Sequence, residues 1–270
     1  MLELSQIKKF YPETLQGFER LMIREYLQYQ ILRLLFNGPH SHKLTFLGGT
    51  CLRIVHGNQR FSEDLYFDNH NLRESEFEEI STHLAKELQQ LGYDVEIQSI
   101  IRGAYHCYVK FPNLLFQQGL SGYTNEKVLI QLDTEPQDYV YQPAEIIINK
   151  FDVFEKIPTT PLPLLMAQKC YAVLNRKRNK GRDFFDLAFL MSLQEKPDMT
   201  YIQQKLGISH GDDLKRHLLD KCQSLDMAAM AKDVEPFLFI PGDIKKVLYF
   251  EELLFGYKLL IFVKQKLIES

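Results

Sequence analysis

The sequence predicts an α/β protein in which a mixed β-sheet with flanking helices is followed by a mostly helical C-terminal domain. Three observations support this. A strand, a glycine turn, a short helix and a second strand follow one another between residues 46 and 68. The hydrophobic pattern then alternates between helical and strand periods up to residue 133. After residue 149 it becomes proline-bounded and helical, so we expect two domains, residues 1–155 and 156–270.

Helical spacing of apolar residues predicts helices over residues 14–36 and 73–91, which end at Asn37-Gly38-Pro39 and at Gly92. Strand periods follow at residues 95–101, 105–111 and 127–133. In the C-terminal part, Pro158, Pro161 and Pro163 predict a stiff connection, and a helix follows over residues 164–175. Lysine-punctuated apolar residues at 257–267 predict an amphipathic packing helix.

Composition narrows the class of protein. The net charge of −3 argues against a protein that coats nucleic acid through its overall charge, although it leaves room for a local basic patch. The sequence contains neither a signal-peptide pattern nor 18 uninterrupted apolar residues, which predicts a cytoplasmic protein without a membrane segment. The cysteines lack CxxC spacing, so neither a zinc site nor a disulfide framework is expected from Cys51, Cys107, Cys170 and Cys222.

The stretch from Phe46 to Asp68 holds the first candidate site. A Gly48-Gly49-Thr50 turn ahead of a helix over residues 51–56 would expose backbone N–H groups that can bind phosphate. A strand starting near Phe61 would place Asp64, Tyr66 and Asp68 on one face, because strand side chains alternate. Amides for phosphate and carboxylates for a metal ion suit magnesium-dependent handling of a nucleoside triphosphate. The alternative is a structural turn beside solvated carboxylates.

The same stretch resembles the nucleotidyltransferase-like AbiEii/AbiGii toxin family, a type IV toxin–antitoxin family with MenT-like nucleotidyltransferases. Its GGT-x-L-R turn is matched by Gly48, Gly49, Thr50, Leu52 and Arg53. Its R-x-S-E-D-[IL]-D-[FL] strand is matched by Arg60, Ser62, Glu63, Asp64 and Leu65. The match departs at one position, because Tyr66 stands where the family has its second metal-binding Asp.

The resemblance implies a nucleotidyltransferase-like fold, bound Mg²⁺ or Mn²⁺, and a nucleoside triphosphate contacted by Gly48, Gly49, Thr50, Arg53 and Ser62. It places the metal on Asp64 and points to Asp133, at the end of an apolar run, as a catalytic or metal-binding carboxylate, with Glu135 and Asp152 as competitors. Tyrosine is a neutral phenol and a poor ligand for a hard cation.

Three explanations of Tyr66 stay open. The chain can be a natural member with weakened or altered chemistry, or an inactivated copy. In the third explanation a bulge makes Asp68 the second ligand, since a regular strand would place it about 7 Å beyond position 66 at ~3.4 Å per residue.

A second cluster follows the predicted domain boundary. Six positive residues and no acidic one lie between Lys169 and Arg182, and Asp183 and Asp186 follow at i, i+3. Helix capping alone could explain the two carboxylates. The segment also resembles a later family motif, R-x-K-x-R-D-x-x-D-L after a helix lysine. The resemblance implies that Lys169 and Arg182 contact triphosphate, while Asp183 and Asp186 position those cations or act as base.

Together these features predict Mg²⁺-dependent transfer of a nucleoside monophosphate to an RNA acceptor, such as the 3′ end of a transfer RNA, or to a protein hydroxyl. An antitoxin partner is implied by the resemblance alone. Two alternatives remain: a catalytically inactive member that binds nucleotide or RNA, and an interaction protein whose glycine turn and acidic strand are structural.

Overall fold

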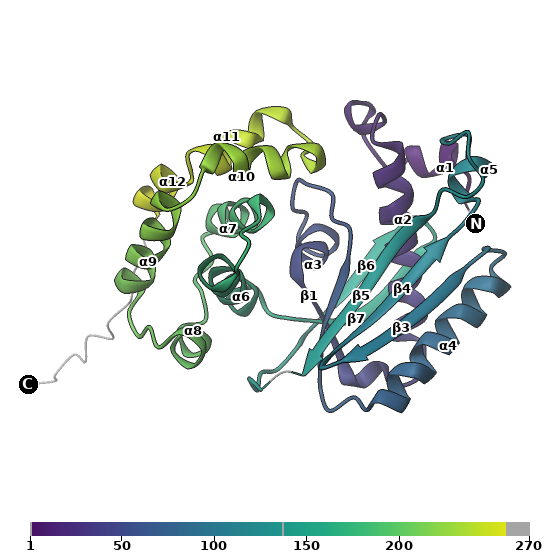
Figure 1. Ribbon diagram of the computed structural model, residues 1–270, viewed down its shortest axis with the longest axis horizontal. Helices are drawn as coiled ribbons and strands as arrows, with labels where there is room; N and C mark the ends of the chain where they lie inside the picture. Colours follow the sequence, from purple (N-terminus) through teal and green to yellow (C-terminus); the bar gives the residue numbers. More distant parts are fainter. Residues whose placement is uncertain (1, 137, 258–270) are drawn as a thin grey trace, which may run out of the picture. The chain divides into compact units, whose positions relative to one another are not determined.

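The computed structural model describes residues 2–136 and 138–257, and the chain divides into two compact units, Met1–Pro161 and Leu162–Ser270. Figure 1 shows the sheet of the first unit and the helices of the second. The amphipathic helix expected at 257–267 lies almost wholly outside the described residues.

The first unit is built on a mixed seven-stranded sheet in the order β3-β4-β5-β2-β1-β7-β6. The pairs β2–β5 and β1–β7 are parallel, and the other neighbours are antiparallel. This confirms the expected mixed sheet. The strands are β1 Leu44–Leu47, β2 Leu65–Asn69, β3 Glu96–Arg102, β4 Ala104–Phe111, β5 Val128–Pro136, β6 Ala144–Lys150 and β7 Val153–Thr159.

Helices α2 and α4 cover one face of this sheet: α2 packs on β5 and β7 and touches α4, which packs on β3 and β4. Apolar side chains of β5 alternate accordingly, with Val128, Ile130 and Leu132 buried and Gln131 and Asp133 on the opposite, more open face. The helices of this unit are α1 Leu4–Lys8, α2 Glu19–Phe36, α3 Gly48–Ile54, α4 Glu74–Gln90 and α5 Leu114–Gln117.

Two boundaries near the glycine turn differ from the sequence prediction. Helix α3 begins at Gly48 itself, and the second strand begins at Leu65, so Asp64 precedes the strand. The reason is that hydrogen bonds from α2 hold the backbone of residues 62 and 63. Gln28 of α2 donates to the carbonyls of Ser62 and Glu63 at 2.9 and 2.8 Å, which occupies backbone groups that strand pairing would need.

The β6–β7 hairpin was not predicted, since its prolines suggested a connection rather than a strand. Its turn contains Phe151 at φ +59°, a left-handed conformation that is rare for an aromatic residue. The ring packs edge-on against Tyr26 and Tyr29, with centroids 5.3 Å away in each case. Pro158 is tolerated because β7 aligns with β1 only at Thr159, so little of that strand edge forms ladder hydrogen bonds.

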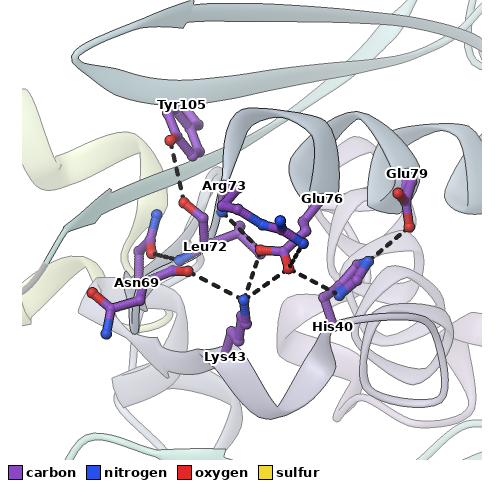
Figure 2. A network of polar contacts seen from close by, with 9 residues as sticks. His40, Lys43, Asn69, Leu72, Arg73, Glu76, Glu79 and Tyr105 are labelled. Atoms are coloured by element: carbon purple, nitrogen blue, oxygen red, sulfur yellow. Dashed lines mark hydrogen bonds and ion pairs between the residues drawn. The ribbon is translucent and has the colours of Figure 1, made fainter.

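A network of polar contacts fixes the turn that follows β2 (Figure 2). Glu76, in the first turn of α4, accepts hydrogen bonds from the Arg73 backbone N–H at 2.8 Å and from Lys43 Nζ at 2.7 Å. Asn69, the last residue of β2, accepts from the Leu72 backbone N–H at 2.6 Å. The network therefore holds the start of α4 against the end of β2.

The second unit is helical. Helix α7 packs on α6, α10 and α11. At its first residue, Gly181, an added Cβ would lie 1.8 Å from the Met230 carbonyl oxygen, so only glycine allows this approach of α10. The helices are α6 Leu162–Asn175, α7 Gly181–Ser192, α8 Met199–Leu206, α9 Gly211–Gln223, α10 Met227–Val234, α11 Lys245–Leu248 and α12 Phe250–Gly256.

Across the portion of the chain that is described, no helix combines the length and apolar character needed to cross a bilayer.

Candidate functional site

The glycine turn lies directly against position 66. Gly48 has φ +83°, and a Cβ built on it would lie 3.3 Å from Tyr66 Cβ and Cδ2. The neighbouring Leu47, the last residue of β1, pairs with Tyr66 in the antiparallel register. A side chain at position 48 would therefore be both strained and crowded by the tyrosine ring.

Strand register brings position 66 beside Asp133. In the parallel β2–β5 pair, Tyr66 aligns with Asp133, and residues opposite each other in a sheet share a face. The turn at Gly48, the ring of Tyr66 and the carboxylate of Asp133 thus lie along one row across three strands. Asp133 is on the face opposite the buried side chains of β5, away from α2 and α4.

Thr50 and Ser62 connect α3 with the segment that contains Asp64. The Thr50 hydroxyl is fully buried; it donates to Ser62 Oγ at 2.9 Å and contacts the backbone carbonyl of Asp64. The structure therefore places Asp64 next to the glycine helix. The Thr50–Ser62 hydrogen bond links α3 to the segment before β2, so both hydroxyls stabilise the fold in addition to any contact with phosphate.

Arg53 is held in a buried ionic cluster. Its Nε donates to Glu25 Oε2 at 2.7 Å, and Lys150 Nζ donates to Glu25 Oε1 at 2.6 Å. Tyr11 adds a hydrogen bond to the same oxygen at 2.9 Å. Burial by itself raises the pKa of Glu25, but the charges of Arg53 and Lys150 more than offset this and keep that pKa below its ordinary value. The cluster fastens α3 to α2 and to the β6–β7 hairpin.

The carboxylate of Asp133 already has two donors in this structure. His106 Nδ1 lies 2.6 Å from Asp133 Oδ1, and Gln131 Nε2 donates to the same oxygen at 2.7 Å. His106 is on β4, directly opposite Asp133 in the antiparallel β4–β5 register. Asp133 is therefore a hydrogen-bonded carboxylate on the open side of the sheet.

Asp68 is engaged elsewhere. Its Oδ2 accepts a hydrogen bond from the Tyr141 hydroxyl, with Thr160 Oγ1 at 3.5 Å, and the side chain is buried. Burial, followed by the neighbouring Asp68 charge, raises the pKa of Tyr141 well above its ordinary value, so the phenol stays a donor.

The expected metal set was Asp64, Asp68 and Asp133. Within residues 2–136 and 138–257, no three His, Cys, Asp or Glu side chains gather so that they could hold a metal ion. Position 66 supplies a phenol, Asp68 is engaged with Tyr141, and Asp133 with His106 and Gln131. The residues present do not fit a divalent ion held by three carboxylates.

In the second unit, Lys169, Asp183 and Asp186 come together. Lys169 Nζ lies 2.8 Å from Asp183 Oδ1 and 2.7 Å from Asp186 Oδ2, and both carboxylates are buried. Arg176 Nη1 adds an ion pair to Asp183 Oδ2 at 3.1 Å, without hydrogen-bond geometry. The Arg182 guanidinium lies 5.8 Å from the centre of the Phe237 ring. A lysine held between two carboxylates has a fixed position.

Sequence reasoning missed His106, Tyr141 and Glu25. Glu25 left a signal, because a carboxylate between apolar residues on the core side of a helix needs buried partners. His106 and Tyr141 left none, since their partners are set by strand register and by a loop far away in the sequence.

Two solved structures from Helicobacter pylori are similar in fold to this chain. JHP933 from Helicobacter pylori is 18% identical, with a TM-score of 0.54 over 87% of this chain and 90% of that one. A candidate nucleotidyltransferase from H. pylori is 19% identical, with a TM-score of 0.52 over 90% of this chain and 94% of the other. No curated protein sequence matches the chain significantly. At these identities the structures show a shared nucleotidyltransferase-like fold.

The sequence model of the nucleotidyl transferase AbiEii toxins of type IV toxin–antitoxin systems matches residues 30–247. The match includes the glycine turn, Asp64, Tyr66 and Asp133 of the first unit and the Lys169 cluster of the second. The chain therefore belongs to the AbiEii nucleotidyltransferase toxin family.

Proposed function

We propose that this protein transfers a nucleoside monophosphate from a nucleoside triphosphate to a hydroxyl group of RNA, with the 3′ end of a transfer RNA as the expected acceptor. The acceptor oxygen forms a bond to the α-phosphorus, the bond from that phosphorus to the bridging oxygen breaks, and pyrophosphate leaves. The hydroxyl proton is released to solvent. Family membership supports the reaction class, and the row of Gly48, Tyr66 and Asp133 supports its location.

In this proposal, the backbone of Gly48, Gly49 and Thr50 binds triphosphate oxygens at the start of α3. Nucleotidyltransferases generally use a divalent metal ion with the triphosphate, and Asp64, whose backbone carbonyl contacts Thr50 of α3, would supply a carboxylate. The phenol at position 66 leaves the donor set incomplete, so we expect the chain as written to be a slow enzyme. Figure 1 marks α3 beside β1 in the first unit.

In the second unit, the family motif assigns phosphate contacts to Lys169 and Arg182, and Asp183 and Asp186 position the lysine. The two ion pairs of 2.8 and 2.7 Å on Lys169 support the positioning part of this role. An antitoxin that restrains the toxin is the partner to expect from a type IV toxin–antitoxin family.

RNA is favoured over a protein acceptor by an exposed basic run between α6 and α7. Arg176, Lys177 and Arg178 are exposed and are followed by Lys180 and Arg182, without an acidic residue among them. Such a run attracts a phosphate backbone even though the whole chain has a net charge of −3.

A second function is favoured by one observation, the engagement of Asp68 and Asp133 together with the phenol at position 66. A protein with this site can bind a nucleoside triphosphate or RNA without transferring the nucleotide.

The two functions are separated by one pair of measurements. Calorimetric titration with each nucleoside triphosphate, with and without Mg²⁺, measures binding. Incubation with α-³²P-labelled nucleotides and either total transfer RNA or bulk protein measures transfer. Label in RNA supports the proposal. Label in protein but not in RNA means that the reaction is as proposed but the acceptor is a protein hydroxyl. Binding without label favours the second function. Absence of both binding and label in the wild type and in Tyr66→Asp contradicts both functions.

A further inference from the structure

The strongest unassigned feature of the site is the pair formed by His106 and Asp133. Asp133 Oδ1 accepts from Gln131 Nε2 at 2.7 Å and lies 2.6 Å from His106 Nδ1. An ionised carboxylate is only an acceptor, so a neutral imidazole at this distance must donate from Nδ1. The ring is thereby fixed in the tautomer that leaves Nε2 with its lone pair.

The ring also stands further out than its partner. The side chain of His106 is 31% exposed, whereas that of Asp133 is 14% exposed. The carboxylate thus orients an imidazole that is more exposed than the carboxylate itself. A histidine that serves packing alone would be buried.

His106 shares the row of the glycine turn. Going across the sheet, His106 on β4 is opposite Asp133 on β5, which is opposite Tyr66 on β2. Neighbouring strands lie about 4.8 Å apart, so the backbone positions 106 and 66 are roughly 10 Å apart, with Asp133 between them. The imidazole therefore shares a face of the sheet with the Tyr66 ring that lies against the glycine turn.

We propose that Nε2 of His106 accepts a hydrogen bond from the attacking hydroxyl of the acceptor and so aims its oxygen at the α-phosphorus. Asp133 and Gln131 act through it by holding the ring. The inference rests on the proposed function and assigns His106 to the acceptor rather than to the triphosphate.

Three substitutions separate this role from a structural one. In His106→Asn the amide can still donate to Asp133 but nothing reaches the Nε2 position. In His106→Gln the longer amide reaches that position but loses the contact with Asp133. His106→Phe loses both.

We expect His106→Asn and His106→Phe to lower kcat/KM for acceptor RNA about 100-fold. His106→Gln should have a smaller loss of kcat/KM, and all three variants should keep the nucleotide Kd within about twofold. Wild-type activity in His106→Asn with loss in His106→Gln would show that the ring only supports Asp133.

A measurement that does not depend on turnover tests the same inference. In ¹⁵N-histidine NMR at pH 8, with His106 assigned by its absence in His106→Asn, the ring should be the Nδ1–H tautomer. A short RNA hairpin with a free 3′ hydroxyl should shift the Nε2 resonance, and its 3′-deoxy counterpart should not. An Nε2–H tautomer, or equal shifts with both RNAs, would overturn the inference. Shifts without nucleotide transfer would leave His106 as an acceptor-binding residue and refute only the proposed transfer.

Discussion

We expect Tyr66 to limit catalysis at the proposed site. Replacing it with aspartate adds a carboxylate next to Asp133 in the β2–β5 register and beside the Gly48 turn. We expect Tyr66→Asp to raise magnesium-dependent incorporation of labelled nucleotide at least tenfold, because a second carboxylate improves binding of a hard cation. The measurement is initial rate against Mg²⁺ concentration.

The control is Tyr123→Asp. Tyr123 is 73% exposed in the loop before β5, and this variant should stay at the wild-type rate. The bulge considered for β2 is absent, because residues 66–69 pair one to one with both β1 and β5. If Tyr66→Asp changes nothing and Asp68→Ala abolishes activity, Asp68 supplies the second carboxylate from a regular strand.

Arg53 matches the family motif, yet the structure gives it a buried partner. Arg53→Ala leaves Glu25 buried with Lys150 as its remaining cation, which should cost about 3 kcal/mol of unfolding free energy. Urea unfolding followed by circular dichroism measures this loss. Arg20→Ala is the control, because the Arg20–Glu126 pair is exposed to solvent and should contribute little to stability. Unchanged stability with lost nucleotide affinity would instead make Arg53 a phosphate ligand.

At the scale of elements, α7 and α10 approach as closely as a glycine allows. Gly181→Ala would drive a Cβ to 1.8 Å from the Met230 carbonyl oxygen and disturb the Gly181 N–H bond to Asp233, 2.9 Å long. We expect a loss of about 2 kcal/mol, read as a lower urea midpoint. Gly242→Ala is the control, since nothing lies within 4 Å of its added Cβ. An equal loss in both variants would contradict the packing explanation.

The junction of β2 and α4 should be sensitive to acid. The Arg73 backbone N–H, then the Arg73 and Lys43 side chains, lower the pKa of Glu76 from 4.5 to about 2. A lowered folded-state pKa means that the stabilisation is complete above pH 4.5 and is lost as the pH falls toward 2. The difference in urea midpoint between wild type and Glu76→Gln should therefore shrink between pH 5 and 3. A difference that stays constant with pH would contradict this.

Local pattern predicted the elements well where one face of a helix or strand is buried. The helices at 14–36 and 73–91 and the three strands up to residue 133 all have counterparts, because their apolar residues repeat at the right period. The hairpin at 144–159 was missed, since Pro158 and the left-handed Phe151 are acceptable only with their tertiary neighbours.

The sequence motifs indicate which residues belong to the candidate site, but they do not indicate which side chains contact one another in the fold. The motif located Gly48, Asp64 and the Lys169 cluster without any knowledge of strand order. The partners of Asp133 and Asp68 depend on register and on a distant loop, and no local pattern encodes either.

At the scale of the whole first unit, β1 joins two parts of the sheet unequally. It aligns with β2 along its full length but with β7 only where Phe46 meets Thr159, reinforced by a 2.9 Å bond from the Thr160 N–H to the Phe46 carbonyl. The hairpin is otherwise held by side-chain contacts with α2, among them Lys150 with Glu25 and Phe151 with Tyr26, so we expect β6 and β7 to open together before the central strands. Deuterium should therefore enter the β6–β7 amides sooner than those of β2 and β5, which mass spectrometry of pepsin fragments can follow. Simultaneous labelling of both regions would mean that the unit opens only as a whole.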